Sequence, residues 1–350
     1  MKIKEIPKTM SAVLLNAYGD FEQLSYEKNI PTPKPKENEV LVQVNAAGVN
    51  NTDINTRIGW YSKSDDLDEA SWSGESLKFP RIQGADVCGY VVAVGENISK
   101  ERIGQRIIIE PCLYDVNGKE LENILYFGSE CDGGFAQYTT VSSKHAYEIQ
   151  SDYSDAELAS FACSYSTAEN LLTRSNVSKG DIVLISGASG GVGSGAIQLA
   201  NARGAKVIAI TSASKVDIVK ELGAYRVITR DEDIVEALGQ NSVDVVIDLV
   251  AGKEWPKFLD VLKPKGRYAV SGAIGGAIVE LDIRTLYLKD LSFFGCTVLE
   301  KEVFPNLIKR IENKEIKPLV AKTFDLENIV DAQKEFLNKK HLGKIVLKVD

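Results

Sequence analysis

The chain has 350 residues, 44% of them apolar and 26% charged, which suits a globular protein with two domains. The formal net charge is −8 and no long basic run is present, so we expect no nucleic-acid partner. The sequence has neither an apolar run long enough to cross a membrane nor a signal-peptide core, so we expect a cytoplasmic protein without a membrane partner. Five dispersed cysteines are expected to be buried thiols.

The N-terminal part of the sequence is dominated by short β-rich runs that Gly, Pro and Asn separate. The clearest runs are 11–15, 40–44, 89–94 and 107–110. This pattern is typical of a barrel-like β domain. Two polar stretches, 62–77 and 115–130, are predicted to be irregular loops because they are too long for tight turns.

Near residue 155 the pattern changes to an alternation of helices and strands. The predicted helices include 155–174, 191–203 and 215–222, and the predicted strands are 181–186, 206–210, 225–229, 243–249 and 266–272. Such alternation predicts βαβ units and a parallel sheet. The last run, 344–349, is again β-like and is expected to complete the first domain. We therefore predict one domain of 1–155 with 315–350 and a second of 156–314.

The stretch GASGGVG, residues 187–193, lies between a predicted strand and a predicted helix, where a dinucleotide loop belongs. Small residues let the backbone approach a pyrophosphate, whose charge then faces the positive helix N-terminus. Against G-x-G-x-x-G, the matching residues are Ala188, Gly190 and Gly193. A tight strand–helix connection without a ligand is the alternative, and the surrounding alternation favours the dinucleotide. The predicted cofactor-binding residues here are Ser189, Gly190, Gly191 and Val192.

The end of the second predicted strand indicates which dinucleotide binds. An NAD site usually has an acid here that holds the ribose 2′-hydroxyl. This chain has TSASK at 211–215, whose hydroxyls and lysine suit a 2′-phosphate. The alternative is that Lys215 only begins the next helix on a solvated face. We predict NADPH as the cofactor, with contacts from Thr211, Ser212, Ser214, Lys215 and Arg230.

Five stretches, in this order, resemble the medium-chain dehydrogenase/reductase superfamily, and more narrowly its quinone oxidoreductase and ζ-crystallin-like members. They are AAGVNNTDINTRIGWY (46–61), GADVCGYVVAVG (84–95), DGGFAQY (132–138), SGASGGVGSGAIQLA (186–200) and LGKIVL (342–347). The resemblance covers nearly the whole chain. It implies an α/β oxidoreductase with a GroES-like β-barrel catalytic domain, a Rossmann cofactor domain with a doubly wound parallel sheet, and a site in the cleft between them.

The resemblance also predicts that the chain binds no metal. Zinc members ligate the catalytic ion with a Cys, a His or Glu, and a Cys or Asp, whereas the matching residues here are Asn50, Ala85 and Cys163. One ligand of three is too few for zinc. The lobe that matches the structural zinc site supplies only Cys112 and Cys131.

Without a metal, a quinone or an α,β-unsaturated carbonyl compound is a better hydride acceptor than a simple ketone, because it delocalises the incoming charge onto oxygen. The resemblance implies that Asn50 and Tyr61 face the substrate, that Thr167 seats the nicotinamide and that Lys344 approaches the pyrophosphate. Aromatic packing at a loop edge remains open for Tyr61, and a water-facing strand edge for Lys344. Asp53 and Asp86 are expected to be structural carboxylates.

Two other functions stay open: an alcohol dehydrogenase-like enzyme with an atypical metal site, and an NADPH-binding protein with little turnover. Residues 62–80 are longer and more acidic than in the relatives that the resemblance names, and these acids would disfavour an anionic acyl-CoA. The expected partners are a small-molecule substrate and a second copy in a homodimer. Residues 293–298 are either an edge strand that pairs between subunits or an interior strand.

Overall fold

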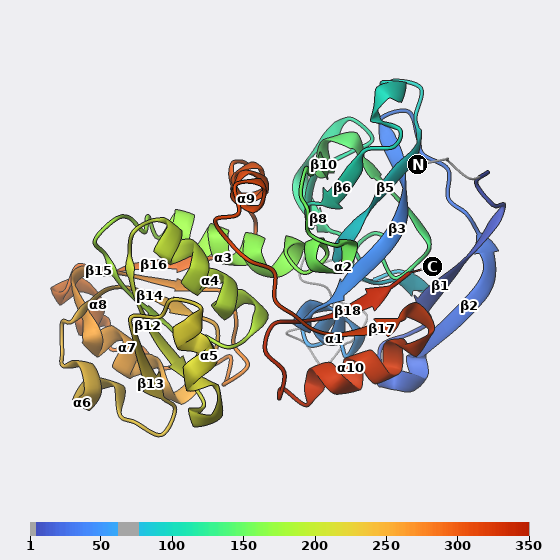
Figure 1. Ribbon diagram of the computed structural model, residues 1–350. Helices are drawn as coiled ribbons and strands as arrows, with labels where there is room; N and C mark the ends of the chain where they lie inside the picture. Colours follow the sequence, from blue (N-terminus) through green and yellow to red (C-terminus); the bar gives the residue numbers. More distant parts are fainter. Residues whose placement is uncertain (1–4, 62–76, 350) are drawn as a thin grey trace. The chain divides into compact units, whose positions relative to one another are not determined.

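The computed structural model describes residues 5–61 and 77–349, and the chain forms two compact units (Figure 1). Unit 1 is Met1–Cys163 with Pro318–Asp350, and unit 2 is Ser164–Lys317. The first boundary therefore lies after the predicted position at residue 155. Residues after 155 stay with unit 1 up to Cys163, whose backbone N–H donates to Asp86 of that unit.

Unit 1 is built on sheets that are mainly antiparallel, and the largest has the order β10–β6–β5–β3–β18–β17, with β9 also paired to β3. Its strands are β3 (Glu39–Val49), β5 (Asp86–Val94), β6 (Arg106–Ile109), β9 (Tyr138–Ser142), β10 (Ala146–Glu148), β17 (Val320–Asp325) and β18 (Lys344–Lys348). A second sheet contains β1 (Thr9–Leu15), β2 (Leu24–Pro31) and β4 (Arg81–Ile82). The four β-rich runs predicted in this region are confirmed, since they fall in β1, β3, β5 and β6.

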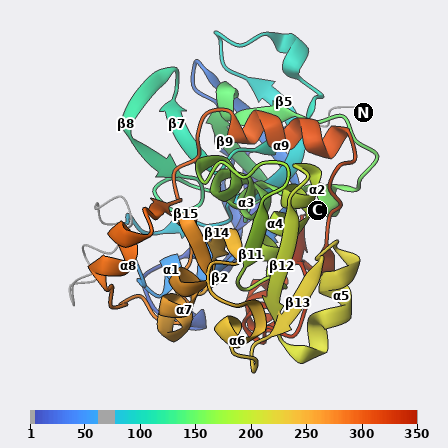
Figure 2. The ribbon, with the colours of Figure 1, turned by 90° about the vertical axis from the view of Figure 1, so that its left-hand side faces the viewer.

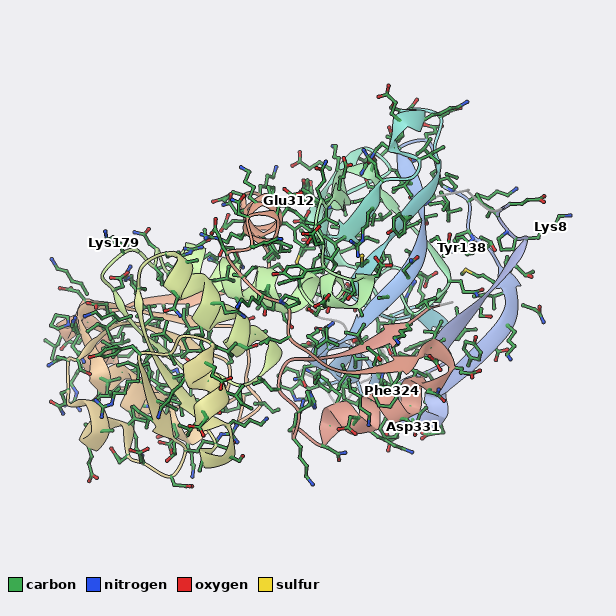
Figure 3. All side chains as sticks on the ribbon, viewed as in Figure 1. Lys8, Tyr138, Lys179, Glu312, Phe324 and Asp331 are labelled. Carbon is green, nitrogen blue, oxygen red and sulfur yellow. The ribbon has the colours of Figure 1, made fainter. Side chains whose placement is uncertain are left out.

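The core of unit 1 follows from the alternation of side chains along these strands. Val40, Val42 and Val44 of β3 point to one side and are buried. Helix α10 (Ile329–Leu337) adds Ile329 and Ala332 to the same core. It packs on β17 and β18, as the labelled Phe324 and Asp331 indicate in Figure 3. Two further helices of unit 1 are α1 (Asn51–Arg57) and α2 (Asp155–Leu158).

The prediction of an irregular loop over 115–130 is wrong. β7 (Cys112–Val116) and β8 (Lys119–Tyr126) pair as an antiparallel hairpin. Asn117 and Gly118 connect them with φ values of 50° and 83°. A two-residue type I′ turn needs positive φ at both positions, and Asn-Gly is its preferred sequence. The polar composition of the segment concealed this signal. The other predicted loop, 62–77, lies outside the described residues except for Leu77.

Unit 2 contains a fully parallel sheet with the order β13–β12–β11–β14–β15–β16, and Figure 2 shows its first five strands side by side. The strands are β11 (Ile182–Ile185), β12 (Lys206–Thr211), β13 (Arg226–Thr229), β14 (Val243–Asp248), β15 (Leu262–Val270) and β16 (Ser292–Gly295). This order confirms the predicted Rossmann domain. β16 ends the sheet, so, of the two alternatives for residues 293–298, the part within β16 is an edge strand; its pairing between subunits stays a prediction.

Most helices of unit 2 lie between these parallel strands in the sequence, and the strand order extends to both sides of β11. The helices are α4 (Gly191–Ala202), α5 (Val216–Glu221), α6 (Ile234–Leu238), α7 (Trp255–Val261), α8 (Ile283–Leu288) and α9 (Val303–Glu312), preceded by α3 (Ala162–Arg174). α4 and α5 contact β11, β12 and β13, whereas α7 contacts β15. In the part of the chain that the structure describes, no helix is long and apolar enough to cross a membrane.

Candidate functional site

A buried ion pair lies in unit 1 beside the ends of β3, β5 and β18. Lys344 Nζ is 2.7 Å from Asp86 Oδ2, and the two side chains are 3% and 0% exposed. Lys344 also donates to Asn50 Oδ1, while Asn50 Nδ2 donates to Asp86 Oδ2 at 2.9 Å. The three side chains form a closed ring, here called the lysine cluster. Its ammonium and its carboxylate are therefore both satisfied without water.

Strand register explains why these three residues meet. Ile345 pairs with Val49, so Lys344 lies opposite Asn50, and Gly48 pairs with Asp86. The alternative that Lys344 faces water at a strand edge is wrong, because its side chain is buried. Its contact with a pyrophosphate stays a prediction. The expected structural role of Asp86 is confirmed by the ion pair.

Asp53 extends the lysine cluster into the first turn of α1. Its Oδ2 accepts a hydrogen bond from Asn50 N at 2.7 Å, which satisfies a backbone group at the helix N-terminus. Burial raises the pKa of Asp53 to about 7, although the hydrogen bond from Asn50 and the charge of Lys344 both act in the lowering direction. Asp53 therefore has the predicted structural role, and its carboxyl can be protonated near neutral pH.

A group of phenol and thiol side chains lies next to the lysine cluster. Cys163 N donates to Asp86, and Cys163 Sγ is 3.0 Å from the hydroxyl of Tyr126 on β8. Burial raises the pKa of Cys163 to about 12, so it is a thiol, as predicted, and not a thiolate. Burial raises the pKa of Tyr126 well above its usual range, so this phenol also keeps its proton. Sequence reasoning missed Tyr126, because it fell in the segment predicted to be a loop.

Tyr61 is half-buried, and its hydroxyl is oriented by α1. It lies 3.4 Å from Thr52 Oγ1 and 3.4 Å from Asn55 Nδ2, and its ring meets Trp60 edge-on at 5.4 Å. Burial raises the pKa of Tyr61, so the phenol keeps its proton as a hydrogen-bond donor. Tyr61 therefore packs as an aromatic ring and also presents a hydroxyl that can form hydrogen bonds.

The residues at the matching zinc positions do not fit a zinc ion. Asn50 has both side-chain polar atoms bound within the lysine cluster, and Ala85 has no donor atom. The Cys163 thiol is protonated, and its Sγ lies 3.0 Å from the hydroxyl of Tyr126. The ammonium of Lys344 binds Asn50 Oδ1, so a positive charge already occupies the atom that a cation would need there. Among residues 5–61 and 77–349, no group of three or more His, Cys, Asp or Glu is arranged to hold a metal.

In unit 2 the predicted phosphate loop joins β11 to α4. Gly187 has φ 58°, which gives the tight turn, and Gly190 is the N-cap of α4 without a side-chain cap. A Cβ on Gly193 would lie 2.4 Å from Gly187 O, so only glycine lets the helix approach the loop this closely. The backbone at Ser189 and Gly190 is thus free of bulky side chains, and it suits a pyrophosphate.

The residues predicted to hold a 2′-phosphate come together at the same edge of the sheet. Thr211 ends β12, and its O accepts a hydrogen bond from Arg230 N at 3.0 Å. Ser212 Oγ and Ser214 Oγ are 3.3 Å apart in the turn that follows. Partial burial, and then the charge of Arg230, lower the pKa of Lys215. Two cations and several hydroxyls therefore share one small region, which suits a dianion.

The remaining predicted cofactor contact, Thr167, lies half-buried on α3. This helix packs closely on the start of α4, since a Cβ on Gly195 would lie 3.1 Å from the ring of Tyr165. Thr167 is therefore in unit 2, on a helix that contacts the one carrying the phosphate loop. Its contact with a nicotinamide stays a prediction.

These features define a two-domain nicotinamide oxidoreductase. Residues 36–151 match the alcohol dehydrogenase GroES-like domain family, and residues 191–313 match the zinc-binding dehydrogenase family. The chain belongs to the medium-chain dehydrogenase/reductase superfamily, whose typical cofactor is NAD(H) or NADP(H).

The relatives include more than one activity. An acryloyl-coenzyme A reductase of Sulfurisphaera tokodaii is 30% identical, with 92% of this chain and 95% of that protein covered. The quinone oxidoreductase of Homo sapiens is 29% identical, with 97% and 98% covered. The crystal structure of a candidate alcohol dehydrogenase from Sinorhizobium meliloti 1021 has a TM-score of 0.92 and 42% identity, with 99% and 98% covered. The matches support an oxidoreductase without fixing the branch.

The lysine cluster predicts a large and specific loss of stability when one partner is removed. Lys344→Met leaves Asp86 buried and unpaired, so the free energy of unfolding should fall by about 3–5 kcal/mol. Lys348→Met, on the exposed side of the same strand, should change it by less than about 0.5 kcal/mol. The double variant Lys344→Met with Asp86→Asn should recover part of the loss in urea denaturation. Equal effects of the two single lysine variants would contradict the prediction.

Proposed function

We propose that this protein is an NADPH-dependent oxidoreductase that reduces quinones or α,β-unsaturated carbonyl compounds without zinc. The observation that carries the proposal is the lysine cluster, since an ammonium, an amide and a carboxylate satisfy one another where a metal would need free ligands. The quinone oxidoreductase and acryloyl-coenzyme A reductase names of two relatives support the same reaction class.

The described side chains suit the needs of this reaction. A bound NADPH supplies the hydride. An enone or quinone carries the resulting negative charge on oxygen, so the site needs positioned hydrogen-bond donors rather than a Lewis acid. We propose that the Tyr61 hydroxyl donates to that oxygen, and that Asn50, held in one orientation by Lys344 and Asp86, lies against the substrate. The proton that completes the reduction can then come from a hydroxyl or from water.

The substrate test compares neutral acceptors with an anionic one. Purified protein treated with a chelator is mixed with NADPH and 1,4-benzoquinone, 9,10-phenanthrenequinone, a simple enone or acryloyl-CoA, and NADPH oxidation is followed. We expect turnover that survives chelation, with the neutral acceptors faster, because residues 62–80 are acidic. Tyr61→Phe should lower kcat by roughly 100-fold, whereas Tyr138→Phe on β9 should not.

Each other outcome of this test overturns a stated part of the proposal. Activity restored only by zinc would favour the alcohol dehydrogenase-like alternative with an atypical metal site. NADPH binding without turnover of any acceptor would favour the binding protein. Faster reduction of acryloyl-CoA than of a neutral enone would remove the argument from the acidic segment, while the reaction class would stand.

Lys215 and Arg230 carry the proposed preference for NADPH. Lys215→Ala and Arg230→Ala should each raise the Kd for NADPH about tenfold, because each removes one charge-assisted contact to the 2′-phosphate. The Kd for NADH should change by less than about twofold. Lys220→Ala, an exposed lysine of α5, is the matched control and should change neither value. Equal losses for NADH and NADPH would contradict this assignment.

We also propose that the protein is a homodimer that forms through the β16 edge of unit 2. The support is the end position of β16 in the sheet and the exposed apolar residues that precede it in the sequence, among which Ile278, Ile283, Tyr287 and Leu288 are 93%, 58%, 59% and 70% exposed. Sedimentation should give twice the chain mass of 38.3 kDa. Leu288→Glu should shift the species to one chain, and a wild-type monomer would refute the proposal.

A further inference from the structure

Asp248, the last residue of β14, is a buried carboxylate that no predicted contact uses. Its Oδ1 accepts hydrogen bonds from Ser186 Oγ at 2.5 Å, from Val250 N at 2.9 Å and from Ala251 N at 3.0 Å. Its Oδ2 accepts one from the Tyr268 hydroxyl at 2.6 Å. The side chain is 0% exposed. Four donors therefore fix the carboxylate, and two of them are backbone groups of the loop that follows β14.

This network lies where the strand order of the sheet reverses. β11 and β14 are neighbours. β12 and β13 lie beyond β11 on one side of the sheet, and β15 and β16 lie beyond β14 on the other. Ser186 immediately precedes the phosphate loop, and its Oγ also accepts a hydrogen bond from Leu249 N at 2.8 Å. A Cβ on Gly187 would lie 3.2 Å from Val250. The network thus ties the phosphate loop to the loop 249–252, the two loops that flank the ligand crevice of such a sheet.

The loop 249–252 has a backbone shape that its sequence does not favour. Ala251 has φ 55° and ψ −146°, a region that residues other than glycine rarely occupy. Gly252 follows with φ 76°, and a Cβ there would lie 2.2 Å from Gly275 O. Such a conformation persists only when neighbouring groups impose it, and Asp248 binds the N–H of Ala251 directly.

We infer that Asp248 is a positioning residue for the cofactor. The pyrophosphate loop follows β11, and the 2′-phosphate residues follow β12 and β13, so the adenosine half of a dinucleotide occupies that side of the reversal point. The β14 side is left for the nicotinamide half. Asp248, with Ser186 and Tyr268, holds the loop 249–252 in the shape that receives it. This inference rests on the proposed NADPH binding.

The experiment compares NADPH with 2′-phospho-ADP-ribose, which lacks the nicotinamide. Asp248→Asn places an amide against the Tyr268 hydroxyl, and Tyr268→Phe removes that donor alone. In both variants the Kd for NADPH should rise about tenfold, the equivalent of about 1.4 kcal/mol. The Kd for 2′-phospho-ADP-ribose should change by less than about twofold, because both variants keep a side-chain oxygen at position 248 that accepts from Ser186 Oγ, and the 2′ residues are unchanged.

Asp244→Asn is the matched control. Asp244 lies near the start of β14, at the other end of the strand from Asp248, and connects β14 to β11. It accepts from Ile182 N at 2.8 Å and from Lys263 Nζ at 2.8 Å. This variant should lower the Tm and leave the ratio of the two Kd values unchanged. Equal weakening of both ligands in Asp248→Asn and Tyr268→Phe, or no change in either, would overturn the positioning role. A wild-type protein that binds neither ligand nor NADH would instead refute the proposed function.

Discussion

The burial of one ammonium group governs how unit 1 is organised. Lys344 can be buried only with a carboxylate and an acceptor close by, and these are Asp86 and Asn50. The requirement brings β18 beside β3, and β3 beside β5, in one register. The register of these three strands therefore depends on one buried charge.

Unit 2 obeys a different constraint, the common direction of its strands. Because all six strands are parallel, every connecting loop that follows a strand emerges at the same edge. The loops on one side of β11 carry cationic and hydroxyl groups, including Lys215. On the other side, Asp248 has its oxygens occupied by donors and presents ordered backbone rather than charge. Charged and hydroxyl groups therefore lie in the loops on one side of β11, and a loop with a fixed backbone conformation lies on the other side.

Most of the architecture could be predicted from periodicity, because strand and helix spacing are local properties. The hairpin at Asn117 was missed although its turn carries a strong local signal, since the polar composition around it suggested a loop. The burial of Lys344 could not be predicted in this way, because a five-residue strand with a lysine at its start has no local sign of a partner carboxylate far away in the sequence. Tyr126 was missed because it lies in the segment predicted to be a loop, and Asp248 because Ser186 and Tyr268, which bind it, are far from it in the sequence.

The separation of Lys344 from Asn50 by 294 positions also orders the events of synthesis. A ribosome releases the chain from its N-terminus, so Asn50 and Asp86 emerge long before the lysine that binds them both. The residues of unit 2 form one continuous stretch and can fold while unit 1 still waits for β17, α10 and β18. The nascent protein therefore lacks the ion-pair partner of Asp86 until translation is nearly complete.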